Sequence, residues 1–166
     1  MDLKGAEVRL RPFERAEVAI VARARPGVDR RRLRRRLAYS GRFHDGRLEL
    51  AIEAGGELVG EVDVRNVAGA MPEGVYELGI EVFRKSRRGR GYGTDAVTVL
   101  VDYLFRGVGA ARIQASTALE NTAMRRVLEK TGFAYEGTMR AFMPSGGGRR
   151  DDFALYAITR GDWEGR

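Results

Sequence analysis

The sequence contains no cysteine among its 166 residues. This absence excludes disulfide bonds, thiolate metal sites and a cysteine nucleophile, and it leaves the redox compartment undetermined. Histidine is nearly as scarce, because His44 is the only one. Its neighbours are polar, so we expect it in a surface loop, and we expect no bound metal.

Long apolar runs are also missing. The first residues, Met1 to Ala6, are followed by a charged residue every few positions, so we expect no secretory leader. No segment approaches the apolar length that a membrane span requires. With 43% hydrophobic and 32% charged residues, the composition is that of a globular protein. We therefore expect one domain over residues 1–166, located in the cytoplasm and without a membrane partner.

Acidic residues are fewer than basic residues. Thirty Lys and Arg residues against 23 Asp and Glu residues give a formal net charge of +7, which attracts polyanions in general. The arginines between Arg30 and Arg36 could bind RNA or an acidic partner, but a solvated helix face is the simpler interpretation. No aromatic residues interleave with this run as stacking platforms. We therefore do not expect nucleic acid to be the partner.

Two periodicities divide the chain into strands and helices. Alternating polar and apolar residues indicate strands, and apolar residues spaced three and four apart indicate helices. Asp29 and Asn121 are suited to cap two of the helices, and Gly55-Gly56 is suited to close a hairpin. The predicted strands lie at 8–11, 48–53, 57–64, 75–83, 112–117, 134–143 and 153–159, and the predicted helices at 14–24, after Asp29, after Gly93 and at 122–131.

The predicted element order is β-α-α-β-β-β-α-β-α-β-β, which places the chain in the α/β class (α+β), with a mixed sheet and helices on its faces. In the third predicted helix, Val97, Leu100, Val101 and Leu104 have the spacing of one buried face. No internal repeat or linker interrupts this order, so a single domain remains the interpretation.

A glycine-rich turn lies between the strand at 75–83 and the helix that follows it. Gly89, Gly91 and Gly93 allow the backbone to approach an anion closely, and the helix start offers unpaired N–H groups. A P-loop would end in Gly-Lys-Ser/Thr, whereas this turn leads into Thr94-Asp95. The dinucleotide pattern G-x-G-x-x-G fails by one residue. The turn therefore predicts a phosphate site of another kind.

The segment Arg88-Gly89-Arg90-Gly91-Tyr92-Gly93-Thr94 resembles the R-x-x-G-x-G/A motif of the GNAT acetyltransferase superfamily. Residues 119–123 and 127–137 resemble the C-terminal half of its RimJ/RimL-like branch, and residues 8–12 and 58–62 resemble its opening strands. The likeness is weakest between Ala24 and Arg47. It implies a mixed, mostly antiparallel sheet with a splayed central strand pair and helices on both faces.

The resemblance also implies a cosubstrate and its pose. Acetyl-CoA or coenzyme A would place its pyrophosphate on the backbone N–H groups of the glycine turn, and its pantetheine arm along the preceding strand like an added strand. Asn121 would hydrogen-bond the arm from the other side, although simple helix capping also explains this residue. The implied contacts are Glu81, Val82, Phe83, Arg88, Gly89, Arg90, Gly91, Tyr92, Gly93, Thr94 and Asn121.

Transfer of an acetyl group to an amine needs a base that accepts the amine proton. Glu77 and Glu81 lie four residues apart in a strand and therefore on one face. The resemblance implies that Glu77 is the base, with Glu81 second, although either glutamate could simply pair with an arginine. The backbone N–H near Val82 could polarise the thioester carbonyl.

The sequence departs from the family pattern at the general acid. The tyrosine that many members carry in the last helix is replaced by Leu128, and the serine and carboxylate of RimL-like members are replaced by Met124 and Met143. Ser116 and Tyr135 are the remaining nearby hydroxyls, so the acid stays unassigned.

The acceptor would be a primary amine, either a protein N-terminus or a small molecule, and a homodimer stays open. The alternative is an acyl-CoA-sensing or RNA-binding module on the same fold without the chemistry.

Overall fold

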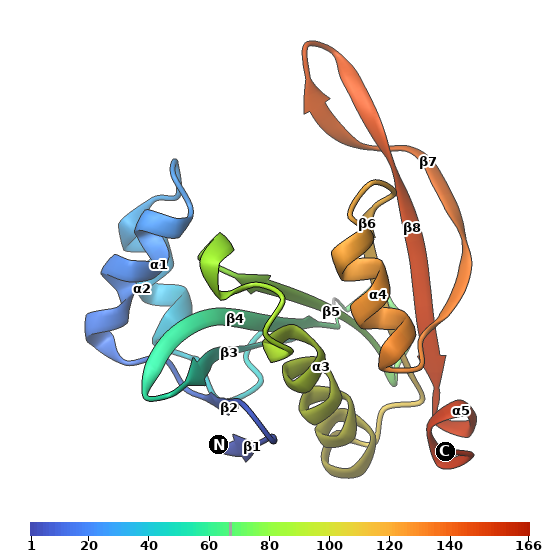
Figure 1. The fold of residues 1–166 in the computed structure, drawn as a ribbon, viewed down its shortest axis with the longest axis horizontal. Coiled ribbons are helices and arrows are strands. Elements are labelled where there is room, and N and C mark those ends of the chain that lie inside the picture. Colours follow the sequence, from blue (N-terminus) through green and yellow to red (C-terminus); the bar gives the residue numbers. More distant parts are fainter. Residues whose placement is uncertain (67) are drawn as a thin grey trace.

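A computed structural model describes residues 1–66 and 68–166. Its eight strands form one open sheet in the order β1-β2-β3-β4-β5-β6-β8-β7, in which only the β5–β6 pair is parallel (Figure 1). The strands are β1 (Leu3–Lys4), β2 (Arg9–Arg11), β3 (Arg47–Ala54), β4 (Glu57–Arg65), β5 (Val75–Val82), β6 (Arg112–Ala118), β7 (Ala134–Gly146) and β8 (Arg149–Thr159). The α-helices are α1 (Val18–Ala24), α2 (Arg30–Leu37), α3 (Tyr92–Tyr103), α4 (Thr122–Lys130) and α5 (Arg160–Glu164).

The predicted fold class is confirmed, as is the order of elements between β2 and β8. Two short terminal elements were missed. Strand β1 has only two residues, paired through Leu3 opposite Leu10, and two residues cannot show alternation. Helix α5 begins with a capping box between Thr159 and Asp162 and is five residues long. Its Trp163 packs on Phe105 at the end of α3, with ring centroids 5.3 Å apart.

Helices cover both faces of the sheet, and each face has its own apolar cluster. The larger cluster lies beneath α3 and α4, where the predicted face of α3, including Val97 and Leu100, is fully buried. The smaller cluster joins α1 and α2 to the sheet through Val21, Leu33 and Phe83. At the start of α2 the Asp29 carboxylate accepts hydrogen bonds from the first-turn N–H groups, as its capping role predicts.

The central strands β5 and β6 separate soon after they meet. Their parallel pairing covers only Val75 to Glu77 of β5, opposite Arg112 to Gln114 of β6. Strand β5 continues to Val82 as a partner of β4 alone. The backbone edge of β5 beyond Glu77 therefore has no strand beside it, and the implied splay is present.

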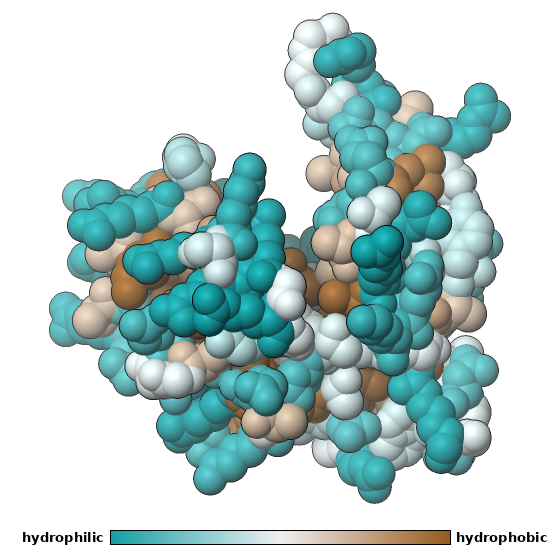
Figure 2. Space-filling view, viewed as in Figure 1, coloured by the Kyte–Doolittle hydropathy of each residue, from teal (hydrophilic) through white to brown (hydrophobic). Residues whose placement is uncertain are grey.

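The last two strands form a long hairpin that projects from the body of the molecule (Figure 1). Its pairing shifts register three times, and Ala141 adopts a positive φ of 50°. Phe142 and Phe153 pack against each other in the outer part, with ring centroids 5.6 Å apart. Together with α1 and α2, the hairpin borders a wide notch in the molecular surface (Figure 2).

Candidate active site

A cleft of about 590 Å³ runs from the glycine turn into the gap between β5 and β6. Its walls come from the end of β5, the start of α3, the end of β6 and the first turns of α4. The lining residues are Leu78, Gly79, Ile80, Glu81, Val82, Arg87, Arg88, Gly89, Gly91, Tyr92, Gly93, Thr94, Ser116, Thr117, Asn121, Ala123, Met124, Arg126, Val127 and Lys130.

The glycine turn is shaped to receive an anion. Gly89 and Gly91 have φ values of +76° and +84°, and a Cβ added at either would meet no atom within 4 Å. Gly91 is the N-cap of α3, whose first intrahelical backbone hydrogen bond runs from the Asp95 N–H to the Gly91 carbonyl. The N–H groups of the first turn thus face open space at the positive end of a twelve-residue helix.

Two arginines of this turn are held by the protein itself. The Arg88 guanidinium donates to the Val82 carbonyl oxygen, with its Nε and Nη2 at 3.3 and 3.2 Å. Arg87 forms an ion pair with Glu57 at the start of β4. Arg90 is exposed and does not line the cleft. These contacts hold the turn against the start of β4 and the end of β5, and they keep Arg87 and Arg88 at the wall of the cleft.

Only alternate residues of β5 turn their backbone groups toward the cleft. The Phe83 N–H donates to the Val59 carbonyl oxygen at 3.0 Å, and Glu81 is opposite Glu61 in the same ladder. By the alternation of an antiparallel pair, the N–H and C=O groups of Val82 therefore point away from β4. Phe83 does not line the cleft, because its side chain packs in the cluster of α1 and α2.

Asn121 caps α4, and its predicted contact with the pantetheine arm stays a prediction. Its Oδ1 accepts from the Met124 N–H at 3.2 Å, which caps α4, and its Nδ2 donates to the Thr117 hydroxyl at 3.0 Å. The residue also lines the cleft opposite β5. One amide hydrogen remains for a ligand, because Nδ2 carries two.

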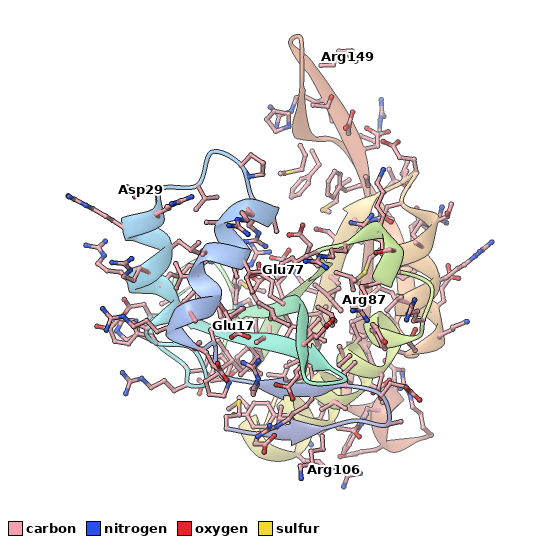
Figure 3. All side chains as sticks on the ribbon, turned by 60° about the vertical axis from the view of Figure 1, so that its left-hand side comes forward. Glu17, Asp29, Glu77, Arg87, Arg106 and Arg149 are labelled. Carbon is pink, nitrogen blue, oxygen red and sulfur yellow. The ribbon has the colours of Figure 1, made fainter. Side chains whose placement is uncertain are left out.

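Glu77 lies at the point where β5 leaves β6, opposite Gln114. Figure 3 shows it in the middle of the molecule, between the α1–α2 side and the hairpin side. Its side chain is 27% exposed and its nearest ion-pair partner is Arg65, at 3.5 Å. Glu81 lines the cleft and pairs with Arg25 at 3.1 Å. Both glutamates thus have an arginine partner and remain partly exposed, but only Glu81 is a lining residue of the cleft.

Sequence reasoning missed two carboxylates on β4. Glu61 and Asp63 are opposite Glu81 and Gly79, so they share the sheet face of Glu77 and Glu81. Burial raises the pKa of the Glu61 carboxyl to about 7, against the lowering effect of Arg25 and Arg36. Their alternation with Val62 and Val64 indicates a strand with one acidic face. That acidic face is the sequence signal that points to these two carboxylates.

Candidate general acids are sparse, as the sequence indicated. Leu128 is fully buried, and Met124 lines the cleft without a hydroxyl. Tyr135 is on the exposed hairpin surface, where its hydroxyl contacts Thr138 at 2.6 Å. Of the hydroxyl residues that the sequence analysis considered, Ser116 lines the cleft. Tyr92, Thr94 and Thr117 also line it and carry hydroxyl groups.

A second hollow, of about 740 Å³, lies beside the arginine-rich helix α2 and away from the cleft. Arg32, Arg35 and Arg36 line it, and Arg36 is paired with Glu49. Tyr39 stacks on His44 here, with ring centroids 3.7 Å apart. An aromatic pair therefore lies beside the arginine run, although no aromatic residue interleaves with it. That nucleic acid is not the partner stays a prediction.

None of the helices within residues 1–66 and 68–166 has the length and hydropathy of a membrane-spanning segment. In the same part of the chain, no group of three or more His, Asp or Glu side chains is arranged to hold a metal ion.

Comparison with known proteins connects this geometry to a family. The model of the acetyltransferase (GNAT) domain matches residues 8–134. YnaD of Bacillus subtilis (strain 168), described as an uncharacterized N-acetyltransferase, is 32% identical over 91 residues, which cover 55% of this chain and 52% of YnaD. The chain thus aligns with about half the length of this curated relative.

Among solved structures, Mycobacterium smegmatis RimJ in complex with CoA-disulfide is 28% identical, with a TM-score of 0.76. The match covers 98% of this chain and 87% of that one. A spermidine N-acetyltransferase SpeG chimera from Vibrio cholerae and hSSAT has a TM-score of 0.83 at 18% identity, covering 97% and 100% of the two chains. At that identity the second likeness shows the fold alone.

Proposed function

The chain belongs to the GNAT acetyltransferase family, and from this premise we propose that it transfers an acetyl group from acetyl-CoA to a primary amine. One observation carries the proposal. The glycine turn at the start of α3 opens into the same cleft as the unpaired backbone edge of β5. An anion site and an extended-chain site are thereby joined end to end, and this matches a cosubstrate with a pyrophosphate and an amide-containing arm.

Different residues of the cleft would hold different parts of the cosubstrate. The first-turn N–H groups of α3 and the open space at Gly89 and Gly91 would hold the pyrophosphate. The backbone groups of Val82 would pair with the arm, and Asn121 would approach it from α4. Phe83, which the sequence analysis placed along the arm, does not line the cleft, and its N–H donates to Val59 of β4. We therefore assign the arm to Val82 and to Ile80, two residues before it.

The amine must lose a proton before or during attack. An alkylamine has a pKa of roughly 10.4, so its neutral form costs about 4–5 kcal/mol at pH 7. We propose that Glu77 accepts this proton, because it is partly exposed at the point where β5 and β6 separate. The amine nitrogen bonds to the thioester carbon, the C–S bond breaks, and the sulfur takes a proton. The Val82 N–H would polarise the carbonyl oxygen, and Ser116 would supply the final proton.

We place the chain in the RimJ/RimL-like branch of the family. The support is the likeness to M. smegmatis RimJ over almost the full length of this chain. The acceptor would be a protein N-terminus or a small amine, reached through the notch between α1–α2 and the hairpin (Figure 2). We expect the reaction to take place in the cytoplasm.

Two measurements on the purified protein test this function. Calorimetry should show coenzyme A binding with submillimolar affinity, and a thiol reagent should detect CoA release from acetyl-CoA when accepted amines are added. The amine panel contains peptides with free N-termini, the same peptides N-acetylated as controls, and small monoamines and diamines. Absence of CoA binding would refute the cofactor cleft. Binding without thiol release for any amine would favour the non-catalytic acyl-CoA-sensing alternative.

A further inference from the structure

Four carboxylates share the sheet face beneath α1 and α2. Glu61 and Asp63 come from β4, and Glu77 and Glu81 come from β5. We call this group the acidic row. Residues two apart in a strand share a face, and the ladder sets Glu61 opposite Glu81 and Asp63 opposite Gly79. Because Gly79 and Glu81 line the cleft, the acidic row adjoins the point where acyl transfer would occur.

The positive charge around the acidic row is smaller than its negative charge. Arg25, at the end of α1, pairs with both Glu61 and Glu81. Arg65 is 3.4 Å from Asp63 and 3.5 Å from Glu77. Two arginines therefore form the ion pairs of all four carboxylates. This local excess of negative charge stands out in a chain whose formal net charge is +7.

Glu61 is the least satisfied member of the acidic row. Its side chain is only 5% exposed, and Arg25 contacts its Oε1. Its other oxygen, Oε2, is buried without a hydrogen-bond partner. The next acid out on this face, Glu49 of β3, is paired with Arg36 of α2 and provides no donor. A buried carboxylate oxygen without a donor is costly, and it marks a place where a cationic group or water would be stabilised.

Asp63 reaches across β5 because residue 79 has no side chain. A Cβ added at Gly79 would lie 2.4 Å from the Oδ1 of Asp63. The carboxylate thus occupies the space above the Gly79 Cα, next to the cleft, while its side chain is still 28% exposed. A carboxylate is therefore presented at the β5 position midway between Glu77 and Glu81.

We propose that the acidic row binds a second positive charge of the acceptor, so that the preferred substrate carries two cationic nitrogens. This inference rests on the proposed acetyltransferase function. At about 3.3 Å per residue, the Gly79 position that Asp63 covers is roughly 6–7 Å from that of Glu77 and the same distance from that of Glu81. An amine reacting beside Glu77 would therefore place a cation four or five bonds away beside Asp63 or toward Glu81. Butane-1,4-diamine has this spacing.

The test compares butane-1,4-diamine with butan-1-amine and ethane-1,2-diamine in the thiol-release assay, with saturating acetyl-CoA. We expect the parent protein to prefer butane-1,4-diamine in kcat/KM by at least tenfold over both. Asp63→Asn and Glu81→Gln should each reduce the preference over butan-1-amine roughly tenfold or more, because a charge-assisted contact is lost. Glu7→Gln removes the same charge from an exposed acid whose N–H donates to Asp95 of α3, on the opposite face of the sheet from the acidic row, and should leave the preference unchanged.

Coenzyme A affinity and thermal unfolding of each variant show whether the cleft and the fold survive. Glu81→Gln is the safer of the two substitutions, because its side chain is 36% exposed. Equal kcat/KM for butan-1-amine and butane-1,4-diamine in the parent would overturn the inference while leaving the acetyltransferase function intact. A diamine preference that persists in both folded variants would overturn it as well.

Calorimetry covers the case in which no panel amine is acetylated. Butane-1,4-diamine titrated into the CoA-bound protein should bind more weakly to Asp63→Asn than to the parent, and absence of binding to the parent would overturn the inference. The second cation could also come from a peptide. Ornithinamide, whose two amino nitrogens are five bonds apart as in the diamine, and norvalinamide, which lacks the second amino group, form that arm of the experiment. Preference for ornithinamide over the free diamine would assign the second charge to a peptide side chain.

Discussion

The carboxylate of Asp63 lies over the Cα of Gly79, where a Cβ would come within 2.4 Å of Oδ1. Gly79 thus lets a β4 carboxylate cover a β5 residue that lines the cleft. We predict that Gly79→Ala displaces Asp63 and lowers kcat/KM for butane-1,4-diamine roughly tenfold or more, while coenzyme A affinity changes little. Steady-state kinetics and calorimetry measure the two effects.

A double-mutant cycle isolates the cause of that loss. If the clash with Asp63 is responsible, Gly79→Ala should cost much less in an Asp63→Ala background. Equal losses in both backgrounds would mean that the added methyl group obstructs the cleft directly.

The glycine turn gives a second prediction. Gly91→Val should abolish coenzyme A binding, because the side chain would project into the open space at the start of α3 and strain a residue at φ +84°. Gly109→Val is the matched control. Gly109 caps the other end of the same helical segment at φ +80° and also has no neighbour within 4 Å. Calorimetric titration of both folded variants should show loss of affinity only for Gly91→Val.

Glu77→Gln tests the proposed base. Glutamine keeps the size and hydrogen-bonding reach of the side chain but cannot accept a proton, so the rate at pH 7 should fall roughly 10²–10⁴-fold. Coenzyme A affinity should barely change, since the turn and the backbone of Val82 are untouched. Part of the rate should return at high pH, where more of the amine is neutral. A parental rate at pH 7 would remove Glu77 from the mechanism.

Glu61 makes the stability of the protein depend on pH. Burial raises the pKa of its carboxyl to about 7 in the folded protein, from an ordinary value of 4.5. Between these values the folded state binds more protons than the unfolded state, so the unfolding free energy falls as pH rises. The contribution is on the order of 3 kcal/mol.

Urea titrations at pH 4.5, 6 and 8 measure the unfolding free energy of the parent and of Glu61→Gln, whose residue 61 cannot titrate. The parent's unfolding free energy relative to the variant should decline from pH 4.5 to 8, with most of the change below pH 7. A difference that stays constant with pH would contradict the raised pKa.

Tyr156→Phe tests whether the Tyr156 hydroxyl contributes to stability or to turnover. The Tyr156 hydroxyl donates to Glu129 at 3.0 Å and accepts from Arg125 at 3.1 Å, and the residue is almost fully buried in β8. We expect a loss of roughly 0.5–1.5 kcal/mol in unfolding free energy and an unchanged turnover. Chemical denaturation and the thiol-release assay give the two values. A large fall in turnover in the folded variant would make Tyr156, in place of Ser116, the candidate for the general acid.

Local patterns were enough to predict most of the elements. The i, i+3, i+4 spacing of Val97, Leu100 and Val101 predicted the buried face of α3, and Asp29 predicted the start of α2, because both signals act within one or two turns of chain. The two-residue strand β1 gave no such signal, since only its pairing with β2 defines it.

The glycine turn and its position between a strand and a helix could be predicted from local sequence, because glycine's freedom at positive φ is a property of the residue. Which groups face the cleft depends on how the strands pair. Phe83 follows Val82 directly, yet ladder pairing with Val59 turns its backbone toward β4. Asp63 and Gly79 are sixteen positions apart and meet only because β4 and β5 pair in that register. Spacing along the chain could not place that carboxylate at the cleft, because register is set by long-range pairing and packing of the whole sheet.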